Sequence, residues 1–320
     1  MKIDIELLKD FEKTLDTINP ESGKIPIKIL GFGEISLVFE IIGDPAHLAY
    51  KRIPIFDTED QVKKHISAYN EYCRILEDEL NFNLPEHKAI WFKDEKEQIQ
   101  FYSIQVKIDP ESVGNNVIHH INDDAVETLI LLAIREMKKV WSFNRKNKIC
   151  DVGLDGQISN FVVMDYDSKN PTIDNNTKLL YLDTSTPMYR INGVDAMEAA
   201  LFLKSTPSFM RFLIKAMFLQ EVLDRYYDWR LVIIDLIANF FKEQKPEIIP
   251  RLIQRINKFF KEEANEFEIA PLTLTEVQKY YKSDKMIWSI FQSARRIDRY
   301  IKTKLLRKKY DFYLPQKIKR

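Results

Sequence analysis

A glycine-bearing turn between two apolar runs limits most strongly what this chain can fold into. The first run ends at Gly31 and Gly33, the second occupies residues 35–42, and a third ends at Lys51. Short runs of Ile, Val, Phe and Tyr bounded by turn residues predict strands. We therefore expect a glycine turn between the first two strands and a lysine on the third, although a plain β-hairpin explains this motif equally well when it stands alone.

A second group of polar residues follows much later in the chain. Asp155 precedes Asn160 by five positions, Asn160 opens the apolar run 161–163, and Asp183 ends the next apolar run. This is the spacing of a catalytic loop followed by a metal-binding aspartate in phosphoryl-transfer enzymes. Taken singly, Asp155-Gly156 is a simple turn and Asp183 a helix cap. The agreement of all three positions with one pattern favours the functional interpretation.

Together the two groups resemble the protein-kinase-like superfamily, and within it the aminoglycoside phosphotransferase-like small-molecule kinases more than the protein kinases. The resemblance covers about residues 25–190. It implies an α+β, bilobal protein-kinase-like fold with an antiparallel-sheet N-lobe (1–107) and a mainly helical C-lobe (108–320). It also implies an ATP-dependent phosphotransferase that uses ATP and Mg²⁺ and acts on the hydroxyl of a small molecule that the sequence does not identify.

The resemblance assigns Lys51 to the α and β phosphates of ATP; a surface lysine at a strand end is the alternative. Glu71, in a helix predicted over residues 58–80, would hold Lys51. The apolar stripe of this helix raises an objection, because at 100° per residue Glu71 lies about 180° from Val62. Either the helix is contacted on two sides, or Glu71 is solvated and Glu77 lies closer to the sheet.

The resemblance makes Asp155 the catalytic carboxylate, which orients the acceptor hydroxyl and accepts its proton. Asn160 and Asp183 would supply oxygen ligands to Mg²⁺, a hard cation that prefers oxygen donors. The remaining contacts are expected from the glycine loop and from the last strand of the sheet. Phosphate would be approached by Gly31, Gly33 and Ser36, and adenine would be bound by the backbone near Gln105 and Val106.

Two departures from the family pattern bear on activity. Gly153 stands where histidine is usual, two positions before Asp155, and Asp183 is followed by Thr184 and Ser185 without the usual glycine. They motivate an alternative function, a pseudokinase that binds nucleotide or acts as a scaffold with little turnover.

The acceptor is expected to be small. Only about ten residues separate Asp183 from a helix predicted to start near Val194, whereas a protein kinase needs a longer activation segment and an Ala-Pro-Glu anchor. Acids after that point either meet a cationic substrate or form a solvated helix face. These acids are Glu198, Glu221, Asp224 and Asp228.

Composition excludes some partners. Lys plus Arg and Asp plus Glu number 48 each, so the whole chain has no charge-driven case for nucleic acid. A basic stretch from Arg295 to the C-terminal end could touch nucleic acid or an anionic membrane, but we expect Tyr300, Leu305 and Leu306 to face the core there, with lysines outside.

The start of the chain, with Asp4 and Glu6, lacks the basic and apolar pattern of a signal peptide, and no apolar run reaches the length of a membrane span. Cys73 and Cys150 lie in segments interpreted as helix or helix end, as unpaired thiols. We therefore expect a cytoplasmic protein.

Periodicity predicts the remaining elements. A leading helix is expected in residues 3–17, and the helix at 58–80 opens with the capping-box pair Thr58 and Gln61. A buried helix is expected over 123–141, and the chain from about 194 to 309 is predicted almost wholly helical. Strands are predicted at 26–31, 35–42, 47–53, 88–93, 98–107, 161–164 and 178–183.

Overall fold

The computed structural model describes residues 1–33, 35–207, 211 and 220–314. Its N-terminal part holds a five-stranded antiparallel sheet in the order β1-β2-β3-β5-β4. The strands are β1 (Ile27–Phe32), β2 (Leu37–Ile41), β3 (Leu48–Arg52), β4 (His87–Lys93) and β5 (Ile99–Val106). All five predicted strands of this part are confirmed, with ends that differ from the predicted ones by one or two residues.

Two helices pack against the sheet. The helix α1 (Ile5–Thr14) buries Leu8 and Phe11 against Phe39 of β2. The helix α2 (Glu59–Arg74), continued by a π-helical turn at Ile75–Glu79, opens with the predicted capping box: the Gln61 amide donates to Thr58 Oγ1, and the Thr58 amide donates to Gln61 Oε1.

A buried ion pair fastens α1 to the sheet. The Arg52 guanidinium of β3 donates to both carboxylate oxygens of Glu12, and both side chains are almost fully buried. Arg52 also donates to Gln100 Oε1 and to the carbonyl of Asp311. Since a buried charge must be paired to be tolerated, this network fixes α1, β3 and the C-terminal residues against each other.

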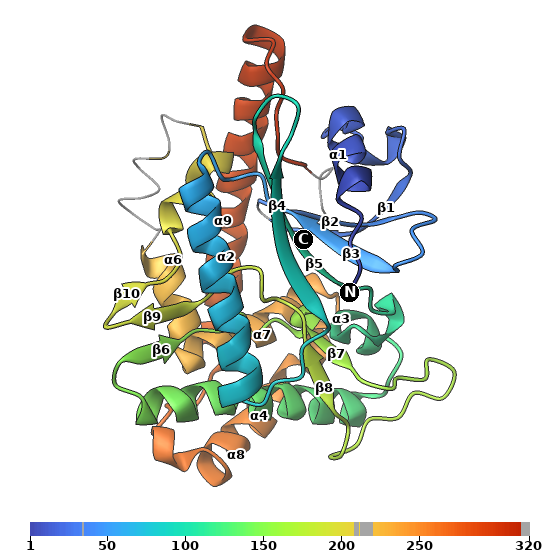
Figure 1. Cartoon of the computed structure of the whole chain (residues 1–320). Helices are drawn as coiled ribbons and strands as arrows, with labels where there is room; N and C mark the ends of the chain where they lie inside the picture. Colours follow the sequence, from blue (N-terminus) through green and yellow to red (C-terminus); the bar gives the residue numbers. More distant parts are fainter. Residues whose placement is uncertain (34, 208–210, 212–219, 315–320) are drawn as a thin grey trace.

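The second part is mainly helical and has one large core. The predicted buried stripe of residues 123–141 is confirmed, because Leu129, Ala133 and Met137 of α4 are fully buried. Figure 1 shows α4 and α8 at the bottom of the molecule and α9 running upward beside the sheet. The helices are α3 (Gly114–Val117), α4 (Asp123–Lys146), α6 (Gln220–Asp224), α7 (Trp229–Lys242), α8 (Ile249–Glu262) and α9 (Leu274–Tyr300).

The predicted fold class is confirmed: an antiparallel sheet forms the N-terminal part and helices dominate the rest. The division at residue 107 stays a proposal. Chain from beyond that point returns to the sheet, because Tyr310, Phe312 and Leu314 are buried with Phe56 and Phe101.

Some predictions about the second part were wrong. The strands predicted at 161–164 and 178–183 are present, but three other short strands were missed, and one of these, β10, contains Val194, where a helix start was predicted. Cys150 begins a strand, not a helix end, although both cysteines are free as expected. The shorter strands are β6 (Cys150–Val152), β7 (Phe161–Val163), β8 (Leu179–Tyr181), β9 (Tyr189–Ile191) and β10 (Val194–Asp195).

Tyr300, Leu305 and Leu306 do not face the core as predicted: they are 60%, 66% and 55% exposed. Residues 208–210 and 212–219, within the segment predicted to be helical, lie outside the described residues.

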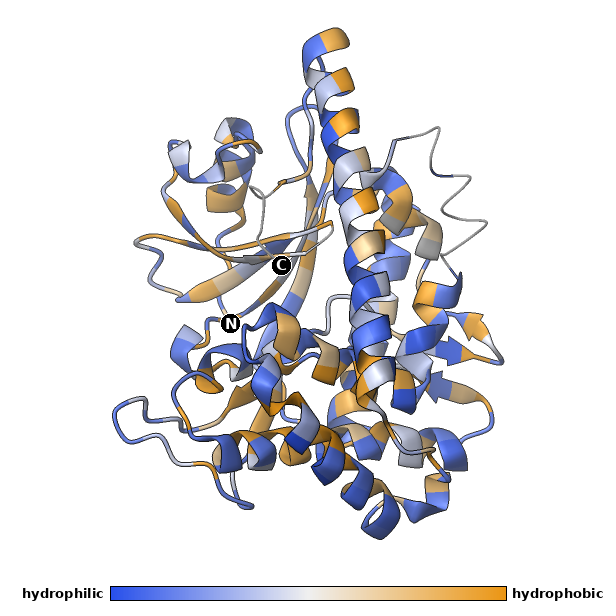
Figure 2. Ribbon diagram, turned by 180° about the vertical axis from the view of Figure 1, so that it is seen from behind, coloured by the Kyte–Doolittle hydropathy of each residue, from blue (hydrophilic) through white to orange (hydrophobic). Residues whose placement is uncertain are grey.

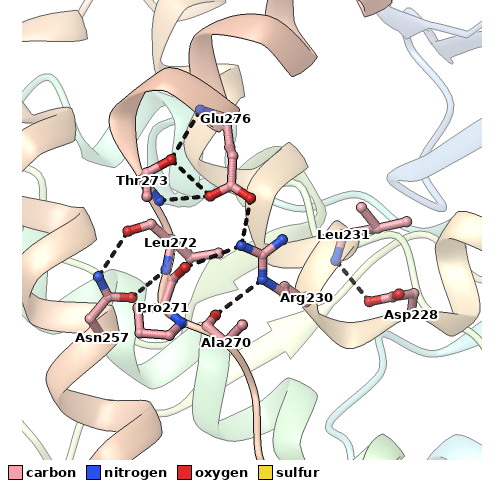
Figure 3. A network of polar contacts seen from close by, with 9 residues as sticks. All are labelled: Asp228, Arg230, Leu231, Asn257, Ala270, Pro271, Leu272, Thr273 and Glu276. Atoms are coloured by element: carbon pink, nitrogen blue, oxygen red, sulfur yellow. Dashed lines mark hydrogen bonds and ion pairs between the residues drawn. The ribbon is translucent and has the colours of Figure 1, made fainter.

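The start of α9 is tied to α7 by a polar network (Figure 3). Arg230 donates to the carbonyls of Ala270 and Pro271 and to Glu276, and Glu276 completes a capping box with Thr273. These bonds give partners to the backbone carbonyls of the loop before α9 and fix the direction in which the long helix leaves the core. In the described part of the chain, no helix has both the length and the apolar character needed to cross a membrane.

Candidate functional site

Lys51 and Asp183 meet although 132 positions separate them. Lys51 sits on β3, and its Nζ lies 2.8 Å from Oδ1 of Asp183, which follows β8. The two side chains are 26% and 19% exposed, so the pair is neither on the open surface nor sealed in the core. The fold thus brings the two sequence groups together between the sheet and the helical part.

A two-stranded ladder places Asn160 beside this pair. β7 and β8 are antiparallel with Phe161 opposite Tyr181, and the Leu182 amide donates to the carbonyl of Asn160 at 2.8 Å. Asn160 therefore precedes one strand and Asp183 follows its partner, so both lie at the same end of the ladder. The Asn160 side-chain amide donates to the carbonyl of Asp155 at 3.2 Å.

The loop that carries Asp155 is held from several sides. Tyr181 Oη also donates to the carbonyl of Asp155, at 3.1 Å, and the Gln157 amide donates to Oδ1 of Asp155 at 3.2 Å. Asp155, Asn160 and the two residues before Asp183 are therefore linked by hydrogen bonds. Asp155 is half-buried.

Gly153 has a steric reason to be glycine. A Cβ there would lie 3.1 Å from the carbonyl oxygen of Tyr226 and 3.2 Å from the ring of Tyr227. Tyr72 of α2 donates its hydroxyl to the carbonyl of Gly153 at 3.0 Å. The space that a histidine side chain would need at this position is thus filled by the Tyr226 carbonyl and the Tyr227 ring. The helix α2 contacts the loop backbone directly through Tyr72.

Burial, together with the negative charges of Asp183 and Asp235, raises the pKa of Asp155 to about 7. A carboxyl group with a pKa near neutrality exchanges its proton readily at physiological pH. This is the electrostatic property that a general base needs.

The predicted partner of Lys51 is not Glu71. The structure pairs Glu71 with Arg74, 2.9 Å away on the same face of α2, while Lys51 pairs with Asp183. The helical periodicity explains the difference, because α2 buries Val62, Tyr69 and Tyr72 and this leaves Glu71 on the outer side. The acidic partner of the strand lysine comes from the second part of the molecule.

The glycine turn is tight. The Gly33 amide donates to the carbonyl of Ser36 at 3.1 Å, and a Cβ on Gly33 would lie 2.8 Å from Ser36 Oγ. Around Gly31, at a bulge in the β1-β2 ladder, a Cβ would meet nothing within 4 Å. The space around Gly31 leaves its backbone open to approach, whereas Ser36 is buried and its predicted phosphate contact would need the turn to open.

Gln105 and Val106 are engaged inside the protein. Gln105 Nε2 donates to the carbonyl of Leu182 at 2.9 Å, which links β5 to the segment before Asp183. The Val106 amide donates to the carbonyl of Glu86 and the Lys107 amide to that of His47. These two donors extend the pairing of β5 with its neighbours on both sides, so adenine binding through the Val106 amide would require a sheet hydrogen bond to break.

Sequence reasoning missed three residues at the site. Tyr72 holds the catalytic-loop candidate, and His65 binds the carbonyl of Ser185 through Nε2 at 3.2 Å; burial lowers the pKa of this histidine to about 4. Asp235 of α7 is buried and contributes to the raised pKa of Asp155. A single acid inside the apolar run 229–241 was the signal that could have identified Asp235.

Two hollows lie near these residues. A small one is lined by Asp155, Arg225, Asp235 and Tyr280, among others. A wider and shallower one of about 490 Å³ includes Asp228, Arg230 and Ala270 in its wall, which Figure 3 draws in part, but none of the predicted catalytic, nucleotide-binding or metal-binding residues. The smaller hollow contains Asp155, but Lys51, Asn160 and Asp183 do not line it.

Two of the four acids proposed for a cationic acceptor have structural roles. Asp224 pairs with Arg190, and Asp228 caps α7 by accepting from the Leu231 amide at 3.0 Å. Glu198 and Glu221 are exposed. Within the described residues, no group of three His, Cys, Asp or Glu side chains could hold a metal ion by itself.

Comparison with solved structures finds low similarity over much of the chain. The GDP and kanamycin complex of APH(2")-IIia is 10% identical, with a TM-score of 0.32, and the match covers 82% of this chain and 99% of that one. WaaP in complex with acyl carrier protein is 12% identical, with a TM-score of 0.33 and coverages of 68% and 89%. The GDP complex of wild-type aminoglycoside 2'-phosphotransferase-IIIa is 10% identical, with a TM-score of 0.31 and coverages of 73% and 92%. Similarities this low carry no argument about function.

No curated protein matches the chain. A family model does match it, over residues 15–299, and this model is described as a family of unknown function. The match spans both the sheet and the helical part, including every predicted site residue. The chain therefore belongs to the family of unknown function DUF6206.

Proposed function

We propose that this protein is a nucleotide-dependent phosphotransferase that transfers the γ-phosphoryl group of ATP to the hydroxyl of a small molecule. The observation that carries the proposal is the Lys51–Asp183 ion pair beside Asn160 and the Asp155 loop. Phosphoryl transfer needs an ammonium near the phosphates, oxygen ligands for a metal and a carboxylate near the acceptor. The ion pair of Lys51 with Asp183 and the hydrogen bond from the Asn160 side chain to the carbonyl of Asp155 support this assignment of all three kinds of group.

Asp155 is the general base in this proposal. Its carboxylate orients the acceptor hydroxyl and accepts its proton as the oxygen attacks phosphorus. A pKa of about 7 lets the group be deprotonated before the reaction and still hold the proton afterwards. Lys51 neutralises the phosphate oxygens, and a phosphate group entering beside Asp183 would take over the ammonium that Asp183 now binds.

The donor set at Asp183 and Asn160 fits Mg²⁺. The Asn160 side-chain nitrogen is bound to the carbonyl of Asp155, which leaves its oxygen as the atom with ligand chemistry, and Asp183 offers a carboxylate. Protein sites for Mg²⁺ commonly use one or two such ligands and complete the shell with phosphates and water. When bound, the metal would neutralise charge on the phosphates.

A second candidate is the pseudokinase that binds nucleotide without turnover. One observation favours it: Lys51 pairs with Asp183 and Glu71 with Arg74, whereas an active kinase pairs its strand lysine with a helix glutamate.

The two candidates differ in turnover. We would measure nucleotide-dependent thermal shifts and the consumption of Mg-ATP and Mg-GTP for the wild-type chain, for Asp155→Asn and for the control Asp78→Asn, which changes an exposed carboxylate outside the site. The phosphotransferase proposal expects a shift with both variants and a loss of turnover of at least about 100-fold with Asp155→Asn alone. A shift without turnover in any of the three supports the pseudokinase, and no shift refutes both.

A further inference from the structure

From its middle onward, α9 and the turn after it expose an unusual number of large apolar side chains. In a solvated helix such residues are scattered, but here they recur through one segment. Their exposures are 59% for Met286, 53% for Ile290, 50% for Ile297, 60% for Tyr300, 66% for Leu305 and 55% for Leu306. This segment was expected to bury Tyr300, Leu305 and Leu306, and the structure reverses that expectation.

The exposed residues of the helix form a stripe. At 100° per residue, Met286, Ile290, Ile297 and Tyr300 lie within an arc of about 80°. Arg295 lies about 180° from Met286 on the same wheel and is fully buried. The helix thus packs on the core with one face and presents the opposite apolar face outward along about 21 Å.

Basic residues flank this stripe. Between residues 285 and 309 there are nine Lys or Arg and one acid, Asp298, in a chain whose charges balance overall. One of the nine, Arg295, lies on the buried face of the helix. Lys304, Arg307, Lys308 and Lys309 are exposed around Leu305 and Leu306. The same surface is therefore apolar along its centre and strongly positive along its sides and its end.

Both ends of the segment are fixed to the protein. The start of α9 is bound by Arg230 of α7, and near its end Arg295 donates to the carbonyl of Tyr313 at 3.0 Å. The residues after the helix, Tyr310 and Phe312, are buried against the sheet. Figure 2 shows hydrophobic bands recurring along the upper half of α9, whose end extends past the rest of the molecule. The helix that carries this surface is therefore anchored to the protein on both sides of it.

We propose that this face of α9 docks on an anionic lipid surface. Interfacial helices combine an apolar face with Lys and Arg beside it, and tyrosine is favoured at the level of the lipid headgroups. Juxtaposed basic residues add attraction to anionic lipids, while their aliphatic stems can lie along the apolar stripe.

Two other occupants fit less well. A second copy of this chain would bring the same positive helix against itself, which like-charge repulsion opposes. A nucleic acid would contact the basic residues but would gain nothing from the four exposed apolar side chains on one face of the helix. The lipid surface is the partner that uses both features, and the proposal stands independently of the phosphotransferase activity.

The test is flotation of the full chain with two kinds of vesicle, phosphatidylcholine alone and phosphatidylcholine mixed with phosphatidylglycerol. We compare wild type with Ile290→Asp/Ile297→Asp and with the control Ile149→Asp/Val194→Asp, which alters residues that are 61% and 70% exposed away from α9. Thermal melts check that each variant folds, and Met286→Ser/Tyr300→Ser is the milder second variant. Binding of a short RNA and the molecular mass in solution are measured for the same proteins.

The proposal expects wild type and control to bind the mixed vesicles at least about tenfold more than the neutral ones, with a loss of at least about tenfold in both α9 variants and weaker binding at high salt. Absence of vesicle binding by the wild type overturns the proposal. So does vesicle binding that the α9 variants retain. RNA binding without vesicle binding assigns the surface to nucleic acid, and a dimer that becomes monomeric in the α9 variants without vesicle binding assigns it to a second copy.

Discussion

Replacing Asp155 by Asn should make the protein more stable at alkaline pH. The carboxyl group is held where burial and the charges of Asp183 and Asp235 oppose its ionisation, so its pKa rises from 3.8 to about 7. Below about pH 4 the group is protonated in both the folded and the unfolded chain. Between about pH 4 and 7 only the unfolded chain releases the proton, so the free energy of unfolding falls as the pH rises, and above about pH 7 the loss is complete.

The size of this effect follows from the shift. A difference of about 3 pH units corresponds to at most about 4 kcal/mol, at about 1.36 kcal/mol per unit. Because Asp155 keeps part of its surface in contact with solvent, we expect a smaller gain of about 1–2 kcal/mol for Asp155→Asn at pH 8. The amide keeps an oxygen that can accept the bond from the Gln157 amide, so the substitution removes the charge and little else.

Urea unfolding of the wild-type chain and of Asp155→Asn at several pH values from 4 to 8 checks the prediction. The slope of the free energy of unfolding against pH between about pH 4 and 7 measures the contribution of the Asp155 proton. The control Asp78→Asn changes an exposed carboxylate and should alter the free energy of unfolding by less than about 0.5 kcal/mol at every pH. If Asp155→Asn is less stable than wild type at pH 8, or has the same pH dependence, the carboxylate is not held in an environment that opposes its charge.

Two further predictions concern the scaffold of the site. Glu12→Gln leaves the buried Arg52 without its counter-charge and should lower the free energy of unfolding in urea by about 3–5 kcal/mol, whereas Glu6→Gln, at an exposed position, should change it by less than about 0.5 kcal/mol; equal effects would contradict the buried pair. Gly156→Ala puts a Cβ 2.5 Å from Val232 Cγ1 and 2.7 Å from Met137 Cε and should cost about 1–3 kcal/mol in the same assay. Gly31→Ala, where a Cβ meets nothing within 4 Å, should be close to neutral, and a larger loss there than at Gly156 would refute the packing argument.

The N-terminal part could be predicted well because its signals are local. The five strands have clear runs of β-forming residues between turns, and Thr58 with Gln61 marks the start of α2 by direct side-chain bonds. The short strands β6, β9 and β10 have two or three residues each, too few for a period-two pattern, and β6 depends on pairing with the distant strand β9. Val194 was therefore interpreted as a helix start.

At the site, the spacing of Asp155, Asn160 and Asp183 was enough to foresee that these residues lie together, because the β7-β8 ladder translates sequence spacing into proximity. The partner of Lys51 could not be found in this way. Glu71 was chosen by its position along the helix, whereas the direction of its side chain is decided by which face of α2 is buried. Tyr72, on the buried face, makes the contact with the loop instead. The exposure of Tyr300 was missed for a similar reason: an apolar stripe predicts a buried face only if another element covers it.

The central claim is that Lys51, Asp155, Asn160 and Asp183 surround one nucleotide–metal site. A crystal structure of the wild-type chain with Mg²⁺ and a non-hydrolysable ATP analogue tests it most directly. The account predicts a metal ion bound by oxygens of Asn160 and Asp183 at about 2.0–2.1 Å, the Lys51 ammonium on the phosphates, and Asp155 facing the terminal phosphate. A nucleotide bound elsewhere, or a metal that neither Asn160 nor Asp183 contacts, would contradict it.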